Sequence, residues 1–309
     1  MIVTLAGGVG AARFLKGLCL IQPPEDLIAV INTADDTVLH GLHISPDIDT
    51  VTYSLAGVDN PETGWGLIGE TWKVMESLNS LGGVTWFQLG DKDLGTHLYR
   101  TNRLTDGDSL TTVTSEIASQ FKIKTKLLPM TNDKVSTFVT LADSGEEISF
   151  QEYFVKLKHS VAVSDIRFDG VKDSRPGPEV IESIISAEKI IIAPSNPLVS
   201  IGPILAISEI FSAIQSRRES TVAISPIVGG LALKGPADRL MRELGHEPSV
   251  VGVARLYKDF AGTLVIDNID ESHRTAIEAL GMRCVVTDTV MSSPTISASL
   301  ASTVLNVES

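Results

Sequence analysis

The sequence predicts an α/β fold, with a doubly wound, Rossmann-like and mostly parallel sheet covered by helices on both faces. Three observations lead to this prediction. Short β-branched apolar runs alternate with longer stretches of helical period, and several of the short runs end in turn residues such as Gly, Pro, Ser, Asn or Asp. The composition, with 43% hydrophobic and 20% charged residues among 309, suits a globular chain with one large core. We therefore treat residues 1–309 as a single α/β domain.

Seven apolar runs are candidate core strands. Each is short and rich in branched side chains, as strands buried on both faces of a parallel sheet are. In chain order they are Ile2 to Leu5, Leu27 to Ile31, Lys126 to Leu128, Lys189 to Ala193, Thr221 to Ile224, Thr263 to Ile266 and Arg283 to Val286. Ligands of such sheets bind outside the carboxyl ends of the strands, so the turns that follow these runs are the first places to look for a functional site.

Two segments interrupt this alternation. Residues 48–120 are mainly helical in pattern, with an Asp/Ser cap opening "DSLTTVTSEIASQF", and they predict a helical insertion that is too long for a plain crossover. Within residues 131–170, "STFVTLADSGEEISFQEYFV" alternates apolar and polar positions around a Gly-containing turn, which predicts a β-hairpin on the rim. Both insertions are expected to be built over the ligand site.

The charge balance restricts the possible partners. With 25 Lys+Arg against 38 Asp+Glu, the net charge is −13, which disfavours nucleic acid and anionic membranes as partners. Cys19 and Cys284 have no zinc-type spacing and are expected to be reduced thiols. "MIVTLAGG" lacks the basic region of a signal peptide and no run of 18 apolar residues occurs, so we expect a cytoplasmic protein. Any anionic ligand must be held locally, by backbone N–H groups, a few cations or a metal.

The first turn, "LAGGVGAARFLKGL", follows a strand and opens a helix. Gly8 and Gly10 allow backbone N–H groups to approach an anion at the helix N-terminus. It is not a dinucleotide fingerprint, because Arg13 stands at the third glycine position and the second strand ends at Asn32 without an acidic residue for a ribose. Phosphate binding is the favoured interpretation, and a structural turn without a ligand is the alternative.

The stretch "INTADDTVLHGLHISPDIDT" holds four aspartates and no lysine or arginine. Asp35 and Asp36 follow the second strand, and Asp47 and Asp49 precede a helix that is expected to begin near Thr50. Carboxylates this close together repel one another, so a divalent cation is the simple remedy, and hard oxygen ligands favour Mg²⁺. The alternative is that Asp47 or Asp49 only caps the helix.

A second acidic pair lies in "WFQLGDKDLGTHLYRTN", where Asp91 and Asp93 flank Lys92. One aspartate could bind metal or substrate while the other caps the following helix, which carries His97 and Arg100. Lys92 and Arg100 are candidates for holding an anionic group, with solvated surface charge as the alternative.

Two further turns follow strands. In "IIIAPSNPLVSIGPIL", Ser195 and Asn196 precede Pro197, which suits the first position of a helix, so this is an anion or nucleotide site or else an unliganded cap. In "ISPIVGGLALKGPADRLM", a glycine pair is followed by Lys234 as a point charge. Four such turns meet in one crevice of a doubly wound sheet. With no G-x-S-x-G or HExxH motif, the pattern favours phosphoryl or nucleotidyl chemistry on an anionic nucleotide.

These segments resemble the 2-phospho-L-lactate transferases, the CofD family of coenzyme F-420 biosynthesis, over nearly the whole chain. "SPDIDT" together with "PSNPLVSIGPI" is the specific combination. The resemblance implies transfer of 2-phospho-L-lactate or phosphoenolpyruvate from a guanosine diphospho-acid donor to the ribityl hydroxyl of the deazaflavin Fo (7,8-didemethyl-8-hydroxy-5-deazariboflavin). GMP is released and coenzyme F-420-0 is formed. It also implies a need for Mg²⁺ and a homodimer.

The resemblance assigns roles to residues of this chain. Asp49 corresponds to a deazaflavin contact, and Lys92 corresponds to a second one, where arginine is common in the family and lysine lacks its bidentate fork. Asp91 is a further substrate-binding candidate. Asp36, Asp47 and Asp49 are the candidates for holding the metal and for orienting the attacking hydroxyl. Gly8, Gly10, Ser195, Asn196 and Pro197 would line the phosphate and guanosine side. The resemblance does not select a general base among the carboxylates.

The alternative from another class is a non-catalytic regulator of the YvcK-like branch, which binds nucleotide sugars. That branch is similar in the first glycine turn and the "ADD" loop, whereas "HISPDIDT" with "LGDKDLGTH" resembles the transferases. A nicotinamide-dependent oxidoreductase is a third possibility, and the interruption of the fingerprint at Arg13 argues against it.

Overall fold

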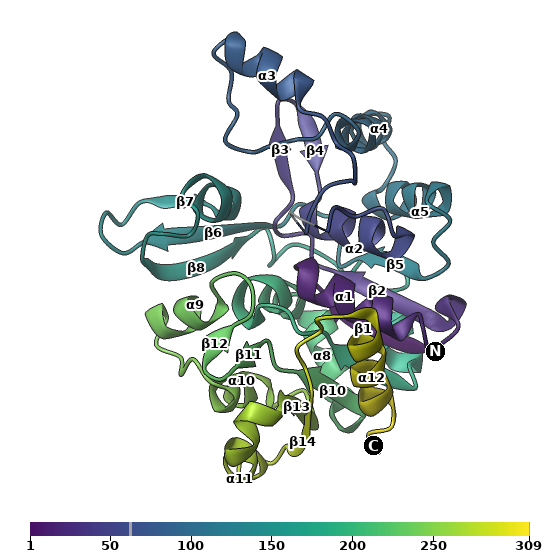
Figure 1. Ribbon diagram of the computed structural model, residues 1–309, viewed down its shortest axis with the longest axis vertical. Coiled ribbons are helices and arrows are strands. Elements are labelled where there is room, and N and C mark those ends of the chain that lie inside the picture. The colour runs from purple at the N-terminus through teal and green to yellow at the C-terminus, as the bar shows by residue number, and fades with distance from the viewer. Residues whose placement is uncertain (62–63, 309) are drawn as a thin grey trace.

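The centre of the protein is a seven-stranded sheet (Figure 1). The computed structural model describes residues 1–61 and 64–308. All neighbouring strands of this sheet run parallel. Their order is β14 (Arg283–Thr287), β13 (Thr263–Asp267), β10 (Thr221–Ile224), β9 (Lys189–Ile192), β1 (Ile2–Ala6), β2 (Leu27–Ile31) and β5 (Lys126–Pro129). The seven expected strands are confirmed, and their observed ends differ from the expected ones by at most one residue.

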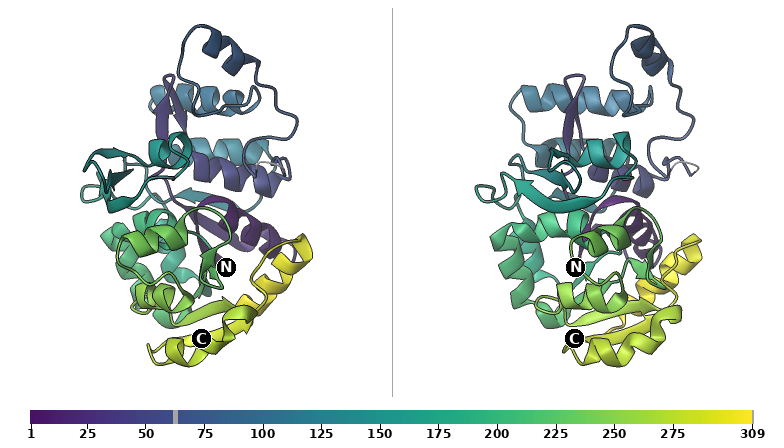
Figure 2. Two further views of the ribbon diagram at one scale, coloured as in Figure 1. Left: turned by 60° about the vertical axis from the view of Figure 1, so that its left-hand side comes forward. Right: turned by 90° about the vertical axis from the view of Figure 1, so that its left-hand side faces the viewer.

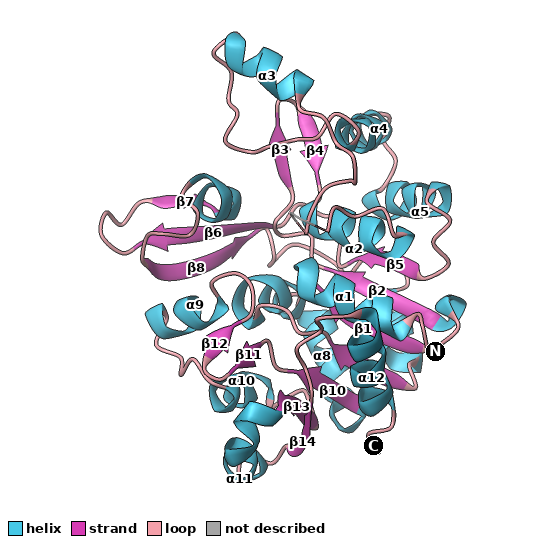
Figure 3. Ribbon diagram, viewed as in Figure 1, coloured by secondary structure: helices cyan, strands magenta, loops and turns pink. Residues whose placement is uncertain are grey.

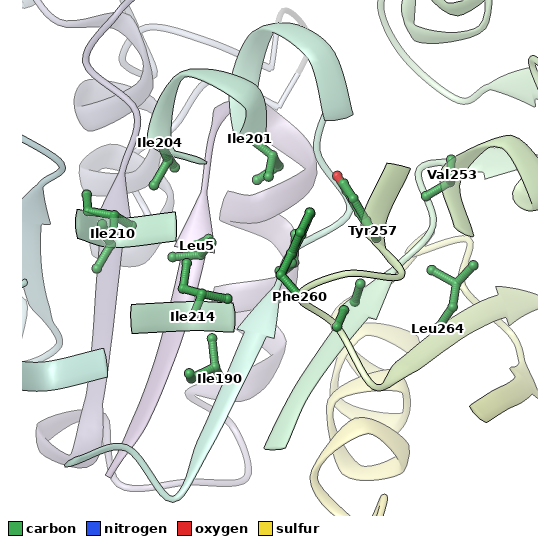
Figure 4. Packing of buried hydrophobic residues seen from close by; sticks show 14 of the residues in the cluster. Leu5, Ile190, Ile201, Ile204, Ile210, Ile214, Val253, Tyr257, Phe260 and Leu264 are labelled. Carbon is green, nitrogen blue, oxygen red and sulfur yellow. The ribbon is translucent and has the colours of Figure 1, made fainter. Parts of the chain in front are cut away.

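Helices cover both faces of the sheet. Along β1, Val3 and Leu5 belong to one buried cluster, while Ile2 and Ala6 belong to another on the opposite face. The first face is covered by α6 (Val180–Ser186), α8 (Ser208–Ser216), α10 (Val250–Tyr257) and α11 (Arg274–Glu278), and the second by α1 (Gly8–Leu18), α2 (Pro46–Ala56) and α12 (Pro294–Leu305). Figure 4 shows Leu5 and Ile190 of the sheet packed against Ile214 of α8. The doubly wound architecture is therefore confirmed.

The order of the strands reverses between β1 and β9. From β1 the chain continues to β2 and β5 on one side, and from β9 it continues to β10, β13 and β14 on the other. The turns after β1 and β9 diverge and open a crevice at the carboxyl edge of the sheet. The Ser195 hydroxyl donates to the Gly7 carbonyl oxygen at 2.8 Å, which joins the two turns. Their backbones lie so close that a Cβ on Gly10 would stand 2.1 Å from the Pro194 carbonyl oxygen.

The connection between β2 and β5 forms the first insertion. It contains the hairpin of β3 (Thr37–Leu39) and β4 (Leu42–Ile44), then α2, α3 (Lys73–Ser80), α4 (Asp93–Thr105) and α5 (Leu110–Gln120). Figure 2 shows α3, α4 and the hairpin standing away from the large sheet. Ser109 caps α5 through its side chain, as the Asp/Ser pattern predicted. The boundaries of 48–120, and the single domain, stay predictions.

The start of α2 differs from the expectation. The helix begins at Pro46 and not near Thr50, because proline suits the first helical position and Ser45 can precede it as the N-cap residue. Asp47 and Asp49 therefore lie inside the first turn, where the positive end of the helix dipole favours carboxylates. Neither aspartate is the N-cap residue of this helix.

The connection between β5 and β9 holds a three-stranded antiparallel sheet (Figure 3). β6 (Ser136–Leu141) and β7 (Glu147–Ser149) form the expected hairpin, followed by a π-helical turn over Glu152–Lys156. β8 (Val163–Asp169) pairs with β6 and was not predicted, because Val163 is its only buried side chain. The range of 131–170 given to this insertion stays a prediction.

A helical segment after β9 packs into the core. It consists of a π-helical turn over Pro197–Ile201, then α7 (Gly202–Ala206) and α8. In the described part of the chain, no single helix is long and apolar enough to cross a membrane, and only this bent pair of helices passes by length and composition. Figure 4 shows Ile201, Ile204 and Ile210 of this segment in the cluster of buried residues.

We expect Gly10→Ala to lower the free energy of unfolding by roughly 2 kcal/mol or more, because the new methyl group overlaps the Pro194 carbonyl. Gly95→Ala in α4 is the matched control, since a Cβ there meets nothing within 4 Å. The control is expected to be neutral or stabilising, because alanine favours helix. Urea unfolding followed by circular dichroism measures both. Equal midpoints for the two variants would contradict the close packing of these turns.

Candidate functional site

A cavity of about 710 Å³ lies at the crevice of the sheet. This volume is in the range of small-molecule sites. The turns after β1 and β9 line it, together with both insertions and the segments after β10 and β14. Its lining residues include Gly8, Val9, Gly10, Arg13, Asp35, Asp47, Asp49, Tyr53, Trp65, Trp86, Phe87, Asp93, His97, Phe150, Phe154, Ser195, Asn196 and Lys234.

Asp47 connects the acidic stretch to the glycine turn. Its Oδ2 accepts from the Asn32 side-chain amide at 3.0 Å, and the backbone N–H of Gly8 donates to the same carboxylate. Gly8 has φ +71°, the left-handed conformation that glycine adopts without strain. Burial raises the pKa of Asp47 to about 6, although both hydrogen bonds act to lower it. The end of β2 and the turn after β1 are thereby held against one carboxylate.

Asp35 and Asp36 are buried beside Asp47. Burial raises the pKa of both carboxyls well above the usual range, and the negative charge of Asp47 raises that of Asp35 further. The Ser45 hydroxyl donates to Asp36 Oδ2 at 2.6 Å. One oxygen of each of the two aspartates is buried without a hydrogen-bond partner. The structure thus gathers carboxylates that repel one another, as the sequence predicted.

Asp49 is held by a buried arginine. Arg100 of α4 is fully buried, and its Nη1 donates to Asp49 Oδ2 at 3.1 Å while Nη2 contacts Oδ1. Burial acts to lower the pKa of Arg100, but the charge and hydrogen bonds of Asp49 outweigh it and raise the pKa. Because Asp47 and Asp49 are two positions apart on a helix, they point in different directions. Asp47 faces the glycine turn and Asp49 faces α4.

His97 lies between two carboxylates. Its Nδ1 is 3.7 Å from Asp49 Oδ2, and its Nε2 is 3.4 Å from Asp93 Oδ2. The Tyr53 hydroxyl donates to Asp93 Oδ1 at 2.5 Å. Burial acts to raise the pKa of Asp93, but the hydrogen bonds and charge around it, chiefly from His97, lower it.

Asp49, Asp93 and His97 could hold a metal ion, because their ligand atoms lie within 4.8 Å of one another. Carboxylates and imidazole are both used as metal ligands in proteins. Arg100 already neutralises Asp49, however, so a cation at this cluster would meet the guanidinium charge.

Comparison with known proteins identifies the family. The family model described as 2-phospho-L-lactate transferase CofD matches residues 2–301. The chain belongs to this family. The resemblance found in the sequence is confirmed, and the protein is a transferase.

Two curated relatives of this CofD chain represent two transferase names. A phosphoenolpyruvate transferase of Streptomyces griseus is 43% identical over 289 residues, which is 92% of this chain and 90% of the relative. A 2-phospho-L-lactate transferase of Methanosarcina mazei is 36% identical over 304 residues, which is 98% of this chain and 99% of the relative. Neither name supports the YvcK-like regulator.

Among solved structures, a member of the upf0052 family from Bacillus halodurans has a TM-score of 0.63. It is 17% identical, and the match covers 99% of this chain and 98% of the other. At this level of identity the likeness shows a shared fold and nothing about the ligands.

Most of the residues proposed from the sequence meet at the cavity. Those that line it are Gly8, Gly10, Asp47, Asp49, Ser195 and Asn196. Asn196 also caps the following helical turn, since its Oδ1 accepts from the Leu198 N–H at 2.9 Å. The helix cap, which was the alternative interpretation of this turn, is therefore present, and the ligand site stays a prediction.

Four of the proposed residues are not among the described residues that line the cavity: Asp36, Asp91, Lys92 and Pro197. Asp91 accepts from the backbone N–H groups of Lys73 and Val74 at 3.2 Å, so it caps α3. The Lys92 ammonium donates to the Ile68 carbonyl oxygen at 2.7 Å. Their roles toward substrate stay predictions.

Tyr53 and the aromatic side chains that line the cavity were not predicted from the sequence as site residues. Asp93 and His97 are visible in the sequence but are not among the predicted site residues. The four-residue spacing of Asp93 and His97 on α4 places them on one helix face and could have identified them. Trp65, Trp86 and Phe87 come from irregular segments, where no periodicity marks a side chain as facing a ligand.

Arg100→Met is expected to lower the free energy of unfolding by roughly 3–5 kcal/mol, because it leaves the buried Asp49 carboxylate without its cation. The double variant Arg100→Met/Asp49→Asn should lose less, since it removes both charges. Arg103→Met is the control on the same helix, where a partly exposed pair with Glu116 contributes about 1 kcal/mol or less. Urea titrations of the variants provide the comparison. If Arg100→Met lowers the free energy of unfolding no more than Arg103→Met does, Arg100 is not the cation that neutralises the buried Asp49.

The metal-free protein is expected to lose stability as the pH rises from about 4 to about 6. The unfolded Asp47 ionises near its ordinary value of 3.8, whereas the folded carboxyl keeps its proton up to about 6, so the folded state binds more protons in this range. Asp47→Asn should remove up to about 3 kcal/mol of this pH dependence. Unfolding midpoints in chelator-treated buffers measure the effect, with exposed Asp173→Asn as the control. An unchanged slope in Asp47→Asn would show that its folded pKa is ordinary.

Proposed function

We propose that the protein transfers a phospho-acid from a guanosine diphospho-acid to the terminal ribityl hydroxyl of the deazaflavin Fo. GMP is released and coenzyme F-420-0 is formed. Membership of the CofD family supports this proposal. The observation that carries it is a single cavity in which anion-binding turns face carboxylates and aromatic rings. Such a cavity suits a reaction between a nucleotide and a flat, hydroxyl-bearing acceptor.

The donor is assigned to the switch point of the sheet. The turn containing Gly8 and Gly10 opens α1, so its backbone N–H groups are suited to phosphate oxygens. Ser195, Asn196 and Pro197 belong to the facing turn after β9 and would take the guanosine side. Binding at a crevice between diverging turns is the general arrangement for nucleotides in doubly wound folds.

The acceptor is assigned to the side of the first insertion. Asp49 is held in one orientation by Arg100, so its carboxylate is pre-positioned for the ribityl chain. Trp86 and Phe87 lie edge to face, with ring centroids 5.8 Å apart, and offer apolar area for the deazaflavin ring system. Lys92 and Asp91 are kept as further contacts of the acceptor by the family resemblance.

The carboxylates fit Mg²⁺. Asp35 and Asp36 each have a buried oxygen without a partner, and the uncompensated negative charge around Asp47 suits a hard divalent cation. We propose Asp36, Asp47 and Asp49 as the residues that would hold it, with Asp35 as an addition from the structure. Because Arg100 already pairs with Asp49, the carboxylate oxygens of Asp47 and of the neighbouring Asp35 and Asp36 are the better ligands for the metal ion. When bound, the ion would neutralise charge on the phosphates.

In the proposed reaction the ribityl oxygen forms a bond to the phosphorus that bears the acid. The bond from this phosphorus to the bridging oxygen breaks, and that oxygen leaves as part of GMP. The hydroxyl proton passes to a carboxylate, for which Asp36, Asp47 and Asp49 are the candidates. Asp47 and Asp49 line the cavity and would orient the hydroxyl.

We propose phosphoenolpyruvate as the first acid to test, because the Streptomyces griseus relative with that name shares more identity than the Methanosarcina mazei 2-phospho-L-lactate transferase. The proposal also includes a cytoplasmic homodimer that acts on small molecules, as the resemblance implies. Sedimentation of the purified protein tests the dimer directly.

The deciding experiment is a turnover assay with Fo, Mg²⁺ and each guanylated phospho-acid made in situ. Equal amounts of GMP and of a heavier deazaflavin are expected, and the added mass identifies the acid. Folded protein that gives no product with any donor would overturn the proposal and favour a nucleotide-binding regulator.

Asp49→Asn is expected to reduce transfer by about 100-fold or more, because the neutral amide no longer orients the acceptor hydroxyl as a carboxylate does. Deazaflavin binding, followed by fluorescence, should weaken in parallel. Exposed Asp106→Asn is the control for loss of one negative charge from the same insertion. If transfer and deazaflavin binding both stay at the wild-type level in Asp49→Asn, the assignment of this residue is wrong.

A further inference from the structure

Two cations line the cavity that also contains the carboxylates Asp47 and Asp49. Arg13 projects from α1, one helical turn after Val9, and Lys234 comes from the segment between β12 (Leu231–Ala232) and α9 (Ala237–Glu243). Both residues line the cavity although they are 221 positions apart in the chain. In the sequence, Arg13 stands out only as a break in a glycine fingerprint, and neither cation has a role in the proposed transfer reaction.

The ammonium of Lys234 lies close to the first insertion. A Cβ on Gly64, in the first insertion, would lie 3.0 Å from Lys234 Nζ and 3.9 Å from a methyl group of Val9. The charge is thus placed between the insertion and the start of α1. Burial, and then the positive charge of Arg13, lowers the pKa of Lys234.

Arg13 and Lys234 form no ion pair within the described residues 1–61 and 64–308. Other lysines and arginines of this part of the chain are also unpaired, but Arg13 and Lys234 are the two that line the cavity. Two cations at one cavity, without a carboxylate partner among the described residues, suit an anion that is not part of the protein.

We propose that Arg13 and Lys234 form an anion subsite for the acid-bearing end of the donor. The identity of this ligand rests on the proposed function. The guanidinium fork can bind a phosphate or a carboxylate through two parallel hydrogen bonds, and the ammonium adds a point charge. The shared chemistry is that of an oxyanion, which is either the second phosphate of the diphosphate or the carboxylate of the acid.

This subsite defines how the donor lies. Guanosine occupies the side of the turn after β9, the phosphates extend over the glycine turn, and the acid points toward Arg13 and Lys234. The anionic group then binds the two cations and not the side of Asp47 and Asp49, which would repel it. The phosphorus lies between the cations and these carboxylates. Discrimination between a guanosine diphospho-acid and GMP follows from the same pair of cations.

Calorimetric binding to Arg13→Gln, Lys234→Gln and the double variant tests the subsite without turnover. The probes are GMP, GDP, and phosphoenolpyruvate in the presence of saturating GMP, with Mg²⁺ throughout. If the second phosphate is held, the dissociation constant of GDP should rise about tenfold in each single variant, the usual effect of losing one charge-assisted hydrogen bond. If the carboxylate is held, only phosphoenolpyruvate binding should weaken by this factor. GMP binding should stay within about twofold of wild type in both cases.

Lys172→Gln is the matched control, since it removes an exposed lysine that does not line the cavity. Circular dichroism verifies that every variant is folded. The subsite is overturned if the double variant binds GDP and phosphoenolpyruvate as the wild type does, if Lys172→Gln weakens them equally, or if wild type binds neither probe. A wild type that binds GDP but gives no transfer product would overturn the proposed function alone, and the variants would still decide the subsite.

Discussion

The contact between Arg100 and Asp49 is the interaction on which the arrangement of the first insertion at the cavity depends. It joins α4 to α2, two helices of the same insertion that are separated in sequence by an irregular segment and α3. Tyr53, Asp93 and His97 complete the same interface. A buried ion pair of this kind gives little net stability, because the charges lose their hydration, but it strongly disfavours arrangements that would leave either charge alone. Its value is the single geometry it imposes on the carboxylate.

The second constraint is the concentration of carboxylates beside the glycine turn, where we propose that an anionic nucleotide binds. Asp47 takes part in both features, because it is one of the clustered carboxylates and also accepts a hydrogen bond from the glycine turn. In the proposed reaction, a site made only of carboxylates would repel the donor, and one made only of cations would leave the acceptor hydroxyl without an orienting base. The two kinds of charge come from separate elements, since Asp47 and Asp49 belong to α2, Arg13 belongs to α1, and Lys234 lies between β12 and α9.

The large sheet could be predicted almost completely, because strands buried on both faces carry an uninterrupted apolar signal. β8 has no such signal, since only Val163 is buried. The start of α2 at Pro46 differs from the prediction near Thr50, because Pro46 and Ser45 determine it and the aspartates lie inside the first turn. Local sequence also could not distinguish the cap Asp91 from the buried Asp93 two positions later. That difference arises from tertiary contacts with α3 and Tyr53, which lie up to forty residues away.

The central position of β1 has a consequence for how the chain acquires its structure. β1 pairs with β2 after a short connection, but its other neighbour, β9, begins only at Lys189. During synthesis on the ribosome, one edge of an entirely buried strand is therefore unpaired until well over half of the chain has emerged. Exposed strand edges can pair with other chains. The parallel topology that opens the crevice thus also lengthens the time during which the nascent chain has an unpaired strand edge.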